Sequence, residues 1–483
     1  MGKRTEIICT MGPSTENDDV LRKMIAAGMD VARFNFSHGS HEYHRKHIER
    51  VRRIAAELNK NVAIMMDTKG PEIRTRSNEG GALIRLETGE EVFVTSRDVP
   101  STKQCIALDY ESLPREVGAG DVIFLDDGLV GLKVTDVTGS DIRCRVTNGG
   151  LVGEHKGVNV PNVAVGLPSI TEQDRKDIRF SCEMRVDSIA ASFVRNAQAV
   201  NEIRELCSEC GWPEVLVVSK IESAESLQSF DEILAASDGI MVARGDLGVE
   251  IPPARVPGVQ KQIIRKCNEE YKPVITATQM LESMTQNPRP TRAEVTDVAN
   301  AIDDGTDCVM LSGETAAGKY PVEAVRTMVE VCLETEANLP ERVEYHDRGG
   351  LVQNVSGATG FSAVQAARLV GAKALLCPTL SGRTARIMSA FRPRLPIIAT
   401  APIDLVLRRS CFYWGVECIM VEEKESLTRI CYDTIKQARI QGYLEIDDVV
   451  VITAGDPVTS PMAEVGMPTA ETATNAFVIA QAF

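Results

Sequence analysis

Eight short apolar runs alternate with segments of helical periodicity, and this pattern constrains the fold of the 483-residue chain more than any other feature. Nearly continuous apolar strands separated by helices are typical of a parallel sheet covered on both sides. Eight such units predict an α/β fold of the (β/α)8 TIM-barrel type. The runs are Ile7–Thr10, Val31–Ser37, Val62–Thr68, Ser188–Val194, Leu216–Ile221, Gly239–Gly245, Val274–Gln279 and Cys308–Gly313.

Several of these runs finish in polar residues. In (β/α)8 barrels the active site lies at the carboxyl ends of the strands, so the sequence predicts that chemistry takes place there. The polar residues concerned are Arg33, Asn35, Ser37, Asp67, Lys220, Glu222, Asp246, Thr278 and Ser312.

The third and fourth runs are too far apart for a single crossover connection. Between them lie short alternating strands broken by turn signals such as Asp127-Gly128 and Asn148-Gly149. We therefore expect an inserted β-barrel-like domain over residues 70–170, placed as a lid over the barrel mouth. A second alternating pattern predicts a parallel α/β domain over residues 341–483, which leaves residues 1–69 and 171–340 for the barrel.

The charge and cysteine content narrow the function classes. A formal net charge of -15 argues against a nucleic-acid binder, which needs a basic surface. The sequence contains no apolar segment long enough to predict a membrane span. Its basic N-terminus is not followed by the apolar region of a secretory signal. Thirteen irregularly spaced cysteines fit reduced thiols in the cytoplasm, and we interpret Cys207-x-x-Cys210 as two free cysteines.

Lys220, Glu222 and Asp246 suggest a cation site. Lys220 and Glu222 share one face of their strand because side chains alternate along it, and Asp246 follows the next strand. The two carboxylates would suit one Mg2+ ion, which prefers one or two carboxylates with substrate oxygens and water. The alternatives are an ordinary salt bridge for the first pair and a helix N-cap for Asp246.

Arg33 is suited to hold a phosphate, while Asn35, Ser37, Asp67 and Thr68 offer oxygens with only one charge among them. Such a set suits a monovalent cation, and the alternative is a plain polar rim. The segment Gly313–Lys319 matches the first part of a phosphate-binding P-loop, but Tyr320 replaces the expected Ser or Thr, so we reject that reading.

In the last domain, a strand is followed by hydroxyl and glycine residues at the start of a helix, which is a favourable place for an anion. A simple helix cap is the alternative. These residues are Thr379, Ser381, Gly382, Arg383 and Thr384.

Eight of these segments, in this order and spacing, resemble the pyruvate kinase family across the barrel, the lid and the last domain. The segments are Ile7–Pro13, Arg33–Gly39, Asp67–Arg74, Lys156–Asn159, Ser219–Glu222, Ala243–Glu250, Ala277–Ser283 and Met310–Thr315. The resemblance implies phosphoryl transfer from phosphoenolpyruvate to ADP, giving pyruvate and ATP in the final step of glycolysis.

The resemblance also implies roles for individual residues. Catalysis would fall to Lys220, Arg33 and Thr278, and the substrate would meet Arg33, Lys220, Gly245, Asp246, Thr278 and Ser312. Mg2+ or Mn2+ would bind Glu222 and Asp246, and K+ would bind Asn35, Ser37, Asp67 and Thr68. The nucleotide would meet Asn35, Phe36, Ser37, His38, Arg74 and Lys156. Thr278 with a water molecule is our candidate proton donor to the enolate.

Four finer expectations follow from the resemblance. Members of the family that need K+ carry Glu where this chain has Glu72, so we expect a K+ requirement. The segment Gly455–Gly466 carries no Lys or Arg, which favours a sugar or nucleotide monophosphate effector over a bisphosphate, or an idle site. The family suggests a homotetramer, and because the sequence ends at Phe483 we expect no further C-terminal domain.

Two other functions fit parts of the sequence. A barrel aldolase or lyase would also use a lysine and a metal pair, but such enzymes lack the inserted lid. A metabolite sensor on a decayed kinase scaffold would have lost Lys220 or Glu222, and both are present.

Overall fold

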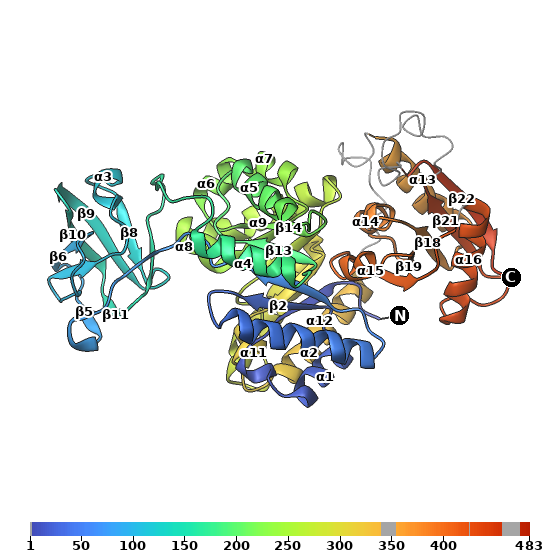
Figure 1. Ribbon diagram of the computed structural model, residues 1–483, viewed down its shortest axis with the longest axis horizontal. Coiled ribbons are helices and arrows are strands. Elements are labelled where there is room, and N and C mark those ends of the chain that lie inside the picture. Colours follow the sequence, from blue (N-terminus) through green and yellow to red (C-terminus); the bar gives the residue numbers. More distant parts are fainter. Residues whose placement is uncertain (1, 340–353, 425, 456–473) are drawn as a thin grey trace.

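The computed structural model describes residues 2–339, 354–424, 426–455 and 474–483, arranged as a lid, a central barrel and a C-terminal domain in one row (Figure 1). The barrel is closed, with strand order β1-β17-β16-β15-β14-β13-β3-β2 and parallel pairing throughout. The predicted eight-stranded parallel barrel is therefore confirmed. Its strands are β1 (Glu6–Thr10), β2 (Val31–Asn35), β3 (Ala63–Asp67), β13 (Ser188–Ala191), β14 (Leu216–Ile221), β15 (Gly239–Ala243), β16 (Val274–Ala277) and β17 (Cys308–Leu311).

Amphipathic helices surround the barrel and bury one apolar face against it. A capping box starts α10, since the Thr291 hydroxyl accepts a hydrogen bond from the Glu294 amide. Cys207 and Cys210 lie at the end of α5 as free thiols. The helices are α1 (Asp18–Ala27), α2 (His41–Glu57), α4 (Glu172–Glu183), α5 (Ala197–Glu209), α6 (Ala224–Gln228), α7 (Phe230–Ala236), α8 (Arg244–Glu250), α9 (Val256–Glu269), α10 (Arg292–Asp304), α11 (Gly313–Ala316) and α12 (Pro321–Asn338).

The lid is a mostly antiparallel β domain with its own apolar core. A seven-stranded sheet has the order β4-β12-β8-β9-β10-β6-β7, and β5 pairs with β11. The strands of four to nine residues lie where the alternating pattern predicts a β domain, while the two- and three-residue strands carry too little pattern to be predicted. The elements are β4 (Ile73–Arg74), β5 (Ile84–Leu86), β6 (Glu91–Thr95), β7 (Cys105–Ala107), α3 (Leu113–Glu116), β8 (Val122–Leu125), β9 (Val130–Thr138), β10 (Asp141–Asn148), β11 (Gly150–Val152) and β12 (Gly157–Asn159).

The C-terminal domain contains a five-stranded sheet of order β20-β19-β18-β21-β22. The parallel pairing of β20, β19, β18 and β21 agrees with the parallel α/β domain predicted from the sequence. The fifth strand, β22, pairs antiparallel with β21 at the sheet edge and was not predicted. The elements are α13 (Val355–Leu369), β18 (Ala374–Pro378), α14 (Arg383–Ala390), β19 (Ile397–Ala401), α15 (Asp404–Ser410), β20 (Val416–Met420), α16 (Leu427–Ile440), β21 (Val449–Ala454) and β22 (Ala476–Gln481).

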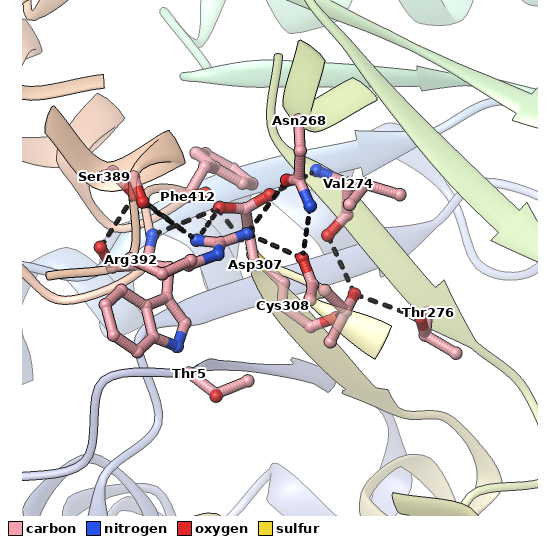
Figure 2. A network of polar contacts seen from close by, with 12 residues as sticks. Thr5, Asn268, Val274, Thr276, Asp307, Cys308, Ser389, Arg392 and Phe412 are labelled. Atoms are coloured by element: carbon pink, nitrogen blue, oxygen red, sulfur yellow. Dashed lines mark hydrogen bonds and ion pairs between the residues drawn. The ribbon is translucent and has the colours of Figure 1, made fainter. Parts of the chain in front are cut away.

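A buried polar network joins the C-terminal domain to the end of the barrel opposite the mouth (Figure 2). Arg392 donates to Asp307 Oδ1 at 2.7 Å, to Asn268 Oδ1 at 3.0 Å and to the Gly305 carbonyl at 2.6 Å. The guanidinium also lies 5.1 Å from the Trp414 ring centroid. Since Asp307 directly precedes β17, this network attaches the C-terminal domain at the amino ends of the strands and leaves the carboxyl ends for the lid.

We propose domain boundaries at residues 69/70, 170/171 and 340/341. The first two fall in the connections between β3 and β4 and before α4; the third lies where residues 340–353 are outside the described ranges. In the parts of the chain that the structure describes, no helix has both the length and the apolar composition needed to cross a membrane.

Candidate active site

Two cations and one carboxylate form the centre of the barrel mouth. Asp67, the last residue of β3, accepts a hydrogen bond from Arg33 Nε at 2.7 Å and from Lys220 Nζ at 3.2 Å. Arg33 also donates to the Thr10 hydroxyl at 2.9 Å. Asp67 is 1% exposed and Arg33 is 8% exposed. The structure thus brings together three residues that are 34 and 153 positions apart in the sequence.

The electrostatics of this cluster favour its charged form. Burial alone would raise the pKa of Asp67, but Arg33 and Lys220 outweigh it and hold that pKa below its usual value. Burial alone would lower the pKa of the Lys220 ammonium, but the carboxylates of Asp67 and Glu222 raise it above its usual value. Asp67 is therefore a fixed anion that keeps two cations in place.

Glu222 lies on the same side of β14 as Lys220, as predicted. Its Oε1 is 2.9 Å from Lys220 Nζ, and its Oε2 accepts a hydrogen bond from the Phe193 amide at 2.6 Å. Within the described residues this ion pair is the one polar contact of the buried Oε1. Burial, with the nearby charge of Asp246, raises the pKa of Glu222 to about 7. A buried carboxylate whose pKa is raised in this way is suited to a divalent cation, which would offset the cost of burying its charge.

Asp246 sits in the first turn of α8, immediately after β15. It lines the same cleft as Asp127 and Glu250, and burial together with the Asp246 charge raises the pKa of both carboxyls. The cleft mouth is therefore acidic on this side. The residues fit a Mg2+ or Mn2+ ion held by Glu222 and Asp246, although no group of three or more ligating side chains in the described residues meets the geometry of a metal site.

Gly245 and Thr278 meet between α8 and the end of β16. The Thr278 hydroxyl accepts a hydrogen bond from the Gly245 amide at 2.9 Å and donates to the Ala277 carbonyl at 2.6 Å. Thr278 has φ of 67°, an unfavourable value for a β-branched residue. Arg244 holds this turn through a 2.7 Å hydrogen bond to the Thr278 carbonyl and another of the same length to Asp297. Strain held by specific contacts is typical of functional sites.

Ser312 follows β17, and its hydroxyl is buried without a hydrogen-bond partner in the described part of the chain. Its amide donates to Glu314 at 2.7 Å, which fixes the backbone. A buried, unpartnered hydroxyl at the barrel mouth is available for a substrate oxygen. Thr276, by contrast, is fully buried and donates to the Thr306 hydroxyl at 3.0 Å (Figure 2).

The loop after β2 carries the residues that the resemblance assigned to K+ and to the nucleotide. Asn35 Oδ1 accepts a hydrogen bond from the Ser37 amide at 3.0 Å, and the Phe36 amide donates to the Asp67 carbonyl at 3.0 Å. The Phe36 ring stacks on His44, whose ring contacts the His38 carbonyl at 2.8 Å. Thr68 adjoins the loop from β3. These oxygens fit a monovalent cation, because only Asp67 among them is charged.

Arg74 and Lys156 of the lid line a cleft together with His38 and Asp246 of the barrel. Each is paired within the lid: Arg74 donates to Glu72 at 2.5 Å, and Lys156 Nζ lies 3.1 Å from Asp126. The structure therefore places both residues at the entrance and not against the Asp67 cluster, with the lid extended away from the barrel in Figure 1.

The predicted anion loop of the C-terminal domain forms one wall of a separate cavity. The Thr379 hydroxyl accepts a hydrogen bond from the Gly382 amide at 3.0 Å, and Thr384 pairs with Thr474 at 3.0 Å. Ser381 and Arg383 also line the cavity, together with Leu427, Ile430, Glu422, Glu423, Lys424 and Asp433. Of the segment Gly455–Gly466, residues 456–466 lie outside the described residues.

Sequence reasoning assigned no role to Ser192, which lies inside the Asp67 cluster. Its hydroxyl accepts a hydrogen bond from Lys220 Nζ at 2.7 Å and is 3.2 Å from Asp67 Oδ1. Its position as a polar residue directly after β13 could have indicated a functional role, since the other site residues were predicted from the same kind of position.

A lidded barrel mouth with two buried cations beside two carboxylates defines a class of barrel enzymes that act on anionic, metal-bound substrates. Family comparison then specifies the class. The model of the pyruvate kinase barrel domain matches residues 2–325, and that of the pyruvate kinase alpha/beta domain matches residues 357–465. The chain belongs to the pyruvate kinase family and is a phosphotransferase.

Individual relatives agree with this assignment. The pyruvate kinase of Staphylococcus aureus strain MRSA252 is 47% identical over 458 residues, which cover 94% of this chain and 78% of that protein. The protein of strain USA300 has the same identity and coverage. A crystal structure of a pyruvate kinase from Cryptosporidium parvum aligns with a TM-score of 0.92 and 39% identity, over 99% of this chain and 96% of that one.

The raised pKa of Glu222 predicts a pH-dependent stability in metal-free protein. Because the folded-state pKa of about 7 lies above the ordinary value of 4.5, the folded protein binds the proton more tightly between these values. The free energy of unfolding of wild type relative to Glu222→Gln should therefore fall as the pH rises from 4.5 to 7 and then level off. The total change should be about 3 kcal/mol.

Urea unfolding with a chelator at pH 5, 6, 7 and 8 measures this difference. The matched control is Glu183→Gln, which removes an exposed carboxylate from the same domain. A difference between wild type and Glu222→Gln that is constant over this range would contradict the prediction.

Proposed function

We propose that the barrel mouth of this chain transfers the phosphoryl group of phosphoenolpyruvate to ADP, giving pyruvate and ATP. The observation that carries the proposal is the buried cluster in which Asp67 holds Arg33 and Lys220 beside Glu222. Phosphoryl transfer needs positioned cations more than covalent chemistry, because charge is spread over the transferring oxygens. Arg33 would bind the phosphate, and Lys220 would stabilise its charge in the transition state.

The remaining site residues follow from this arrangement. Glu222 and Asp246 would hold Mg2+ or Mn2+, which when bound supplies positive charge that bridges and orients the substrate oxygens. The Gly245 amide and the Ser312 hydroxyl would receive the carboxylate end of the substrate. Thr278, with a water molecule, would give the proton to the enolate.

The nucleotide would enter the cleft between barrel and lid. Asn35, Phe36, Ser37 and His38 lie on the barrel side, and Arg74 and Lys156 lie on the lid side. Their present partners, Glu72 and Asp126, would release the two cations when the lid closes on a polyphosphate, since phosphate oxygens carry more charge. Closure would also exclude water from the transfer.

Steady-state assays of pyruvate release from phosphoenolpyruvate and ADP, with Mg2+ and K+, test this function. Wild type should turn over, and Lys220→Met should lose activity by roughly a thousandfold or more, because it removes the transition-state charge. Lys266→Met, which removes an exposed lysine from α9, is the matched control. A folded wild type that releases no pyruvate would contradict the proposal and favour a lyase or sensor.

We further propose that K+ binds Asn35, Ser37, Asp67 and Thr68 and is required for activity. Turnover should drop by roughly tenfold or more when tetramethylammonium replaces K+ at equal ionic strength, because a fixed positive charge is lost from the site. Glu72→Lys should recover part of the lost rate by supplying an ammonium. Equal wild-type rates in both buffers would rule out the requirement.

We propose that the C-terminal cavity binds a phosphorylated effector with a single phosphate. Thr379, Ser381, Gly382, Arg383 and Thr384 would hold that phosphate. Glu422, Glu423 and Asp433, which outnumber Lys424 in the rest of the lining, would disfavour a second one. AMP or ribose 5-phosphate should lower the half-saturating concentration of phosphoenolpyruvate, and Ser381→Ala should weaken this effect. Activation by micromolar fructose 1,6-bisphosphate would contradict the proposal, as would no effect of any monophosphate.

We also propose a cytoplasmic homotetramer. The thirteen cysteines are free thiols, as in a reducing compartment. The edge strand β22 exposes Phe477, Val478 and Ile479, which suits pairing with a second subunit. Light scattering of purified protein tests the tetramer, and a monodisperse monomer would contradict it. Cell fractionation tests the cytoplasmic location, and a secreted protein would contradict it.

A further inference from the structure

Ser192 lies directly after β13 and is 6% exposed, between the residues that we assign to catalysis. We propose that Ser192 is a positioning residue that fixes the Lys220 ammonium for phosphoryl transfer. The inference rests on the proposed function, since it concerns how Lys220 performs that reaction.

The hydroxyl of Ser192 is the nearest partner of the Lys220 ammonium. Nζ donates to Ser192 Oγ at 2.7 Å, whereas Asp67 Oδ1 lies at 3.2 Å and Glu222 Oε1 at 2.9 Å. A neutral oxygen thus makes the shortest contact with a cation that stands between two carboxylates. The position of the ammonium is therefore set by this hydrogen bond as well as by attraction to the two carboxylates.

Ser192 is itself fixed by its neighbours. Its amide donates to Thr68 Oγ1 at 3.0 Å and its hydroxyl donates to the Thr68 carbonyl at 2.7 Å, which leaves the hydroxyl oxygen free to accept from Lys220. On the other side the backbone of Gly70 packs so closely that a Cβ there would lie 2.8 Å from Ser192 Cβ. The hydroxyl therefore cannot follow the lysine if the lysine moves.

The next residue completes the arrangement, because the Phe193 amide donates to Glu222 Oε2 at 2.6 Å. Ser192 and Phe193 together hold the lysine and the carboxylate at a set separation. Without the hydroxyl, attraction would draw the ammonium toward Glu222 or Asp67 and away from a transferring phosphoryl group. A hydroxyl holds the ammonium without cancelling its charge, whereas a third carboxylate would cancel that charge.

The test compares Ser192→Ala with Ser188→Ala. Ser188 begins the same strand, and its buried hydroxyl has no hydrogen-bond partner among the described residues, so Ser188→Ala removes no hydrogen bond there. Loss of a hydrogen bond to a charged group should lower kcat of Ser192→Ala roughly tenfold or more. KM for ADP should change little, and the thermal unfolding midpoint should stay near that of Ser188→Ala.

A double-mutant cycle shows whether Ser192 acts through Lys220. In a Lys220→Arg background, in which the ammonium is gone, Ser192→Ala should cost much less than in wild type. Ser192→Cys keeps a weak acceptor of similar size and should have an intermediate kcat; it also serves if Ser192→Ala does not fold.

The outcomes separate the two proposals. A kcat of Ser192→Ala within about twofold of the control, or an equal loss in both backgrounds, would overturn the positioning role. A loss explained by a lowered unfolding midpoint in both Ser192 variants would also overturn it. Absence of turnover in wild type and Ser188→Ala would instead overturn the proposed function.

Discussion

The carboxylate of Asp67 is the contact on which the site depends. It is 1% exposed and shared by Arg33 and Lys220, two cations that come from different strands. Removing three charges from water is costly, and a buried cation without its partner is costlier still. Here the mutual attraction outweighs desolvation, since the pKa of Asp67 is lowered despite burial. The anion therefore fixes the position of both cations before any substrate arrives.

The barrel makes this arrangement possible because parallel strands end at one edge. β2, β3, β13 and β14 are neighbours in the sheet, so Arg33, Asp67, Ser192 and Lys220 meet although the lid sequence separates them. The opposite edge is closed by the C-terminal domain through Arg392 and Asp307 (Figure 2). One end of the barrel is thus anchored, and the other is left to the lid and the substrate.

Much of this could be predicted from the sequence. The barrel strands carry uninterrupted apolar patterns, and Arg33, Asp67, Lys220 and Glu222 stand at strand ends where period-two alternation fixes their side. Ser192 also stands at a strand end. The sequence did not predict a role for it, because the partners of its hydroxyl follow only from the order of the strands in the barrel. The strand β22 is half exposed, so its residues lack the pattern of a buried strand.

Other features depend on contacts that local patterns do not encode. The positive φ of Thr278 is maintained by Arg244, which lies on a different element. The ion pair between Lys156 and Asp126 depends on how the lid folds, so no local pattern in the sequence predicts it. The short lid strands, two or three residues long, carry no periodicity at all.

The central claim is that one buried carboxylate holds two cations in place for phosphoryl transfer. The most direct measurement is kcat of Asp67→Asn at saturating substrates, Mg2+ and K+, with circular dichroism to confirm folding. The account predicts a loss of roughly a hundredfold or more in a folded protein, because both cations lose their common anchor. A folded Asp67→Asn protein that turns over at the wild-type rate would contradict it.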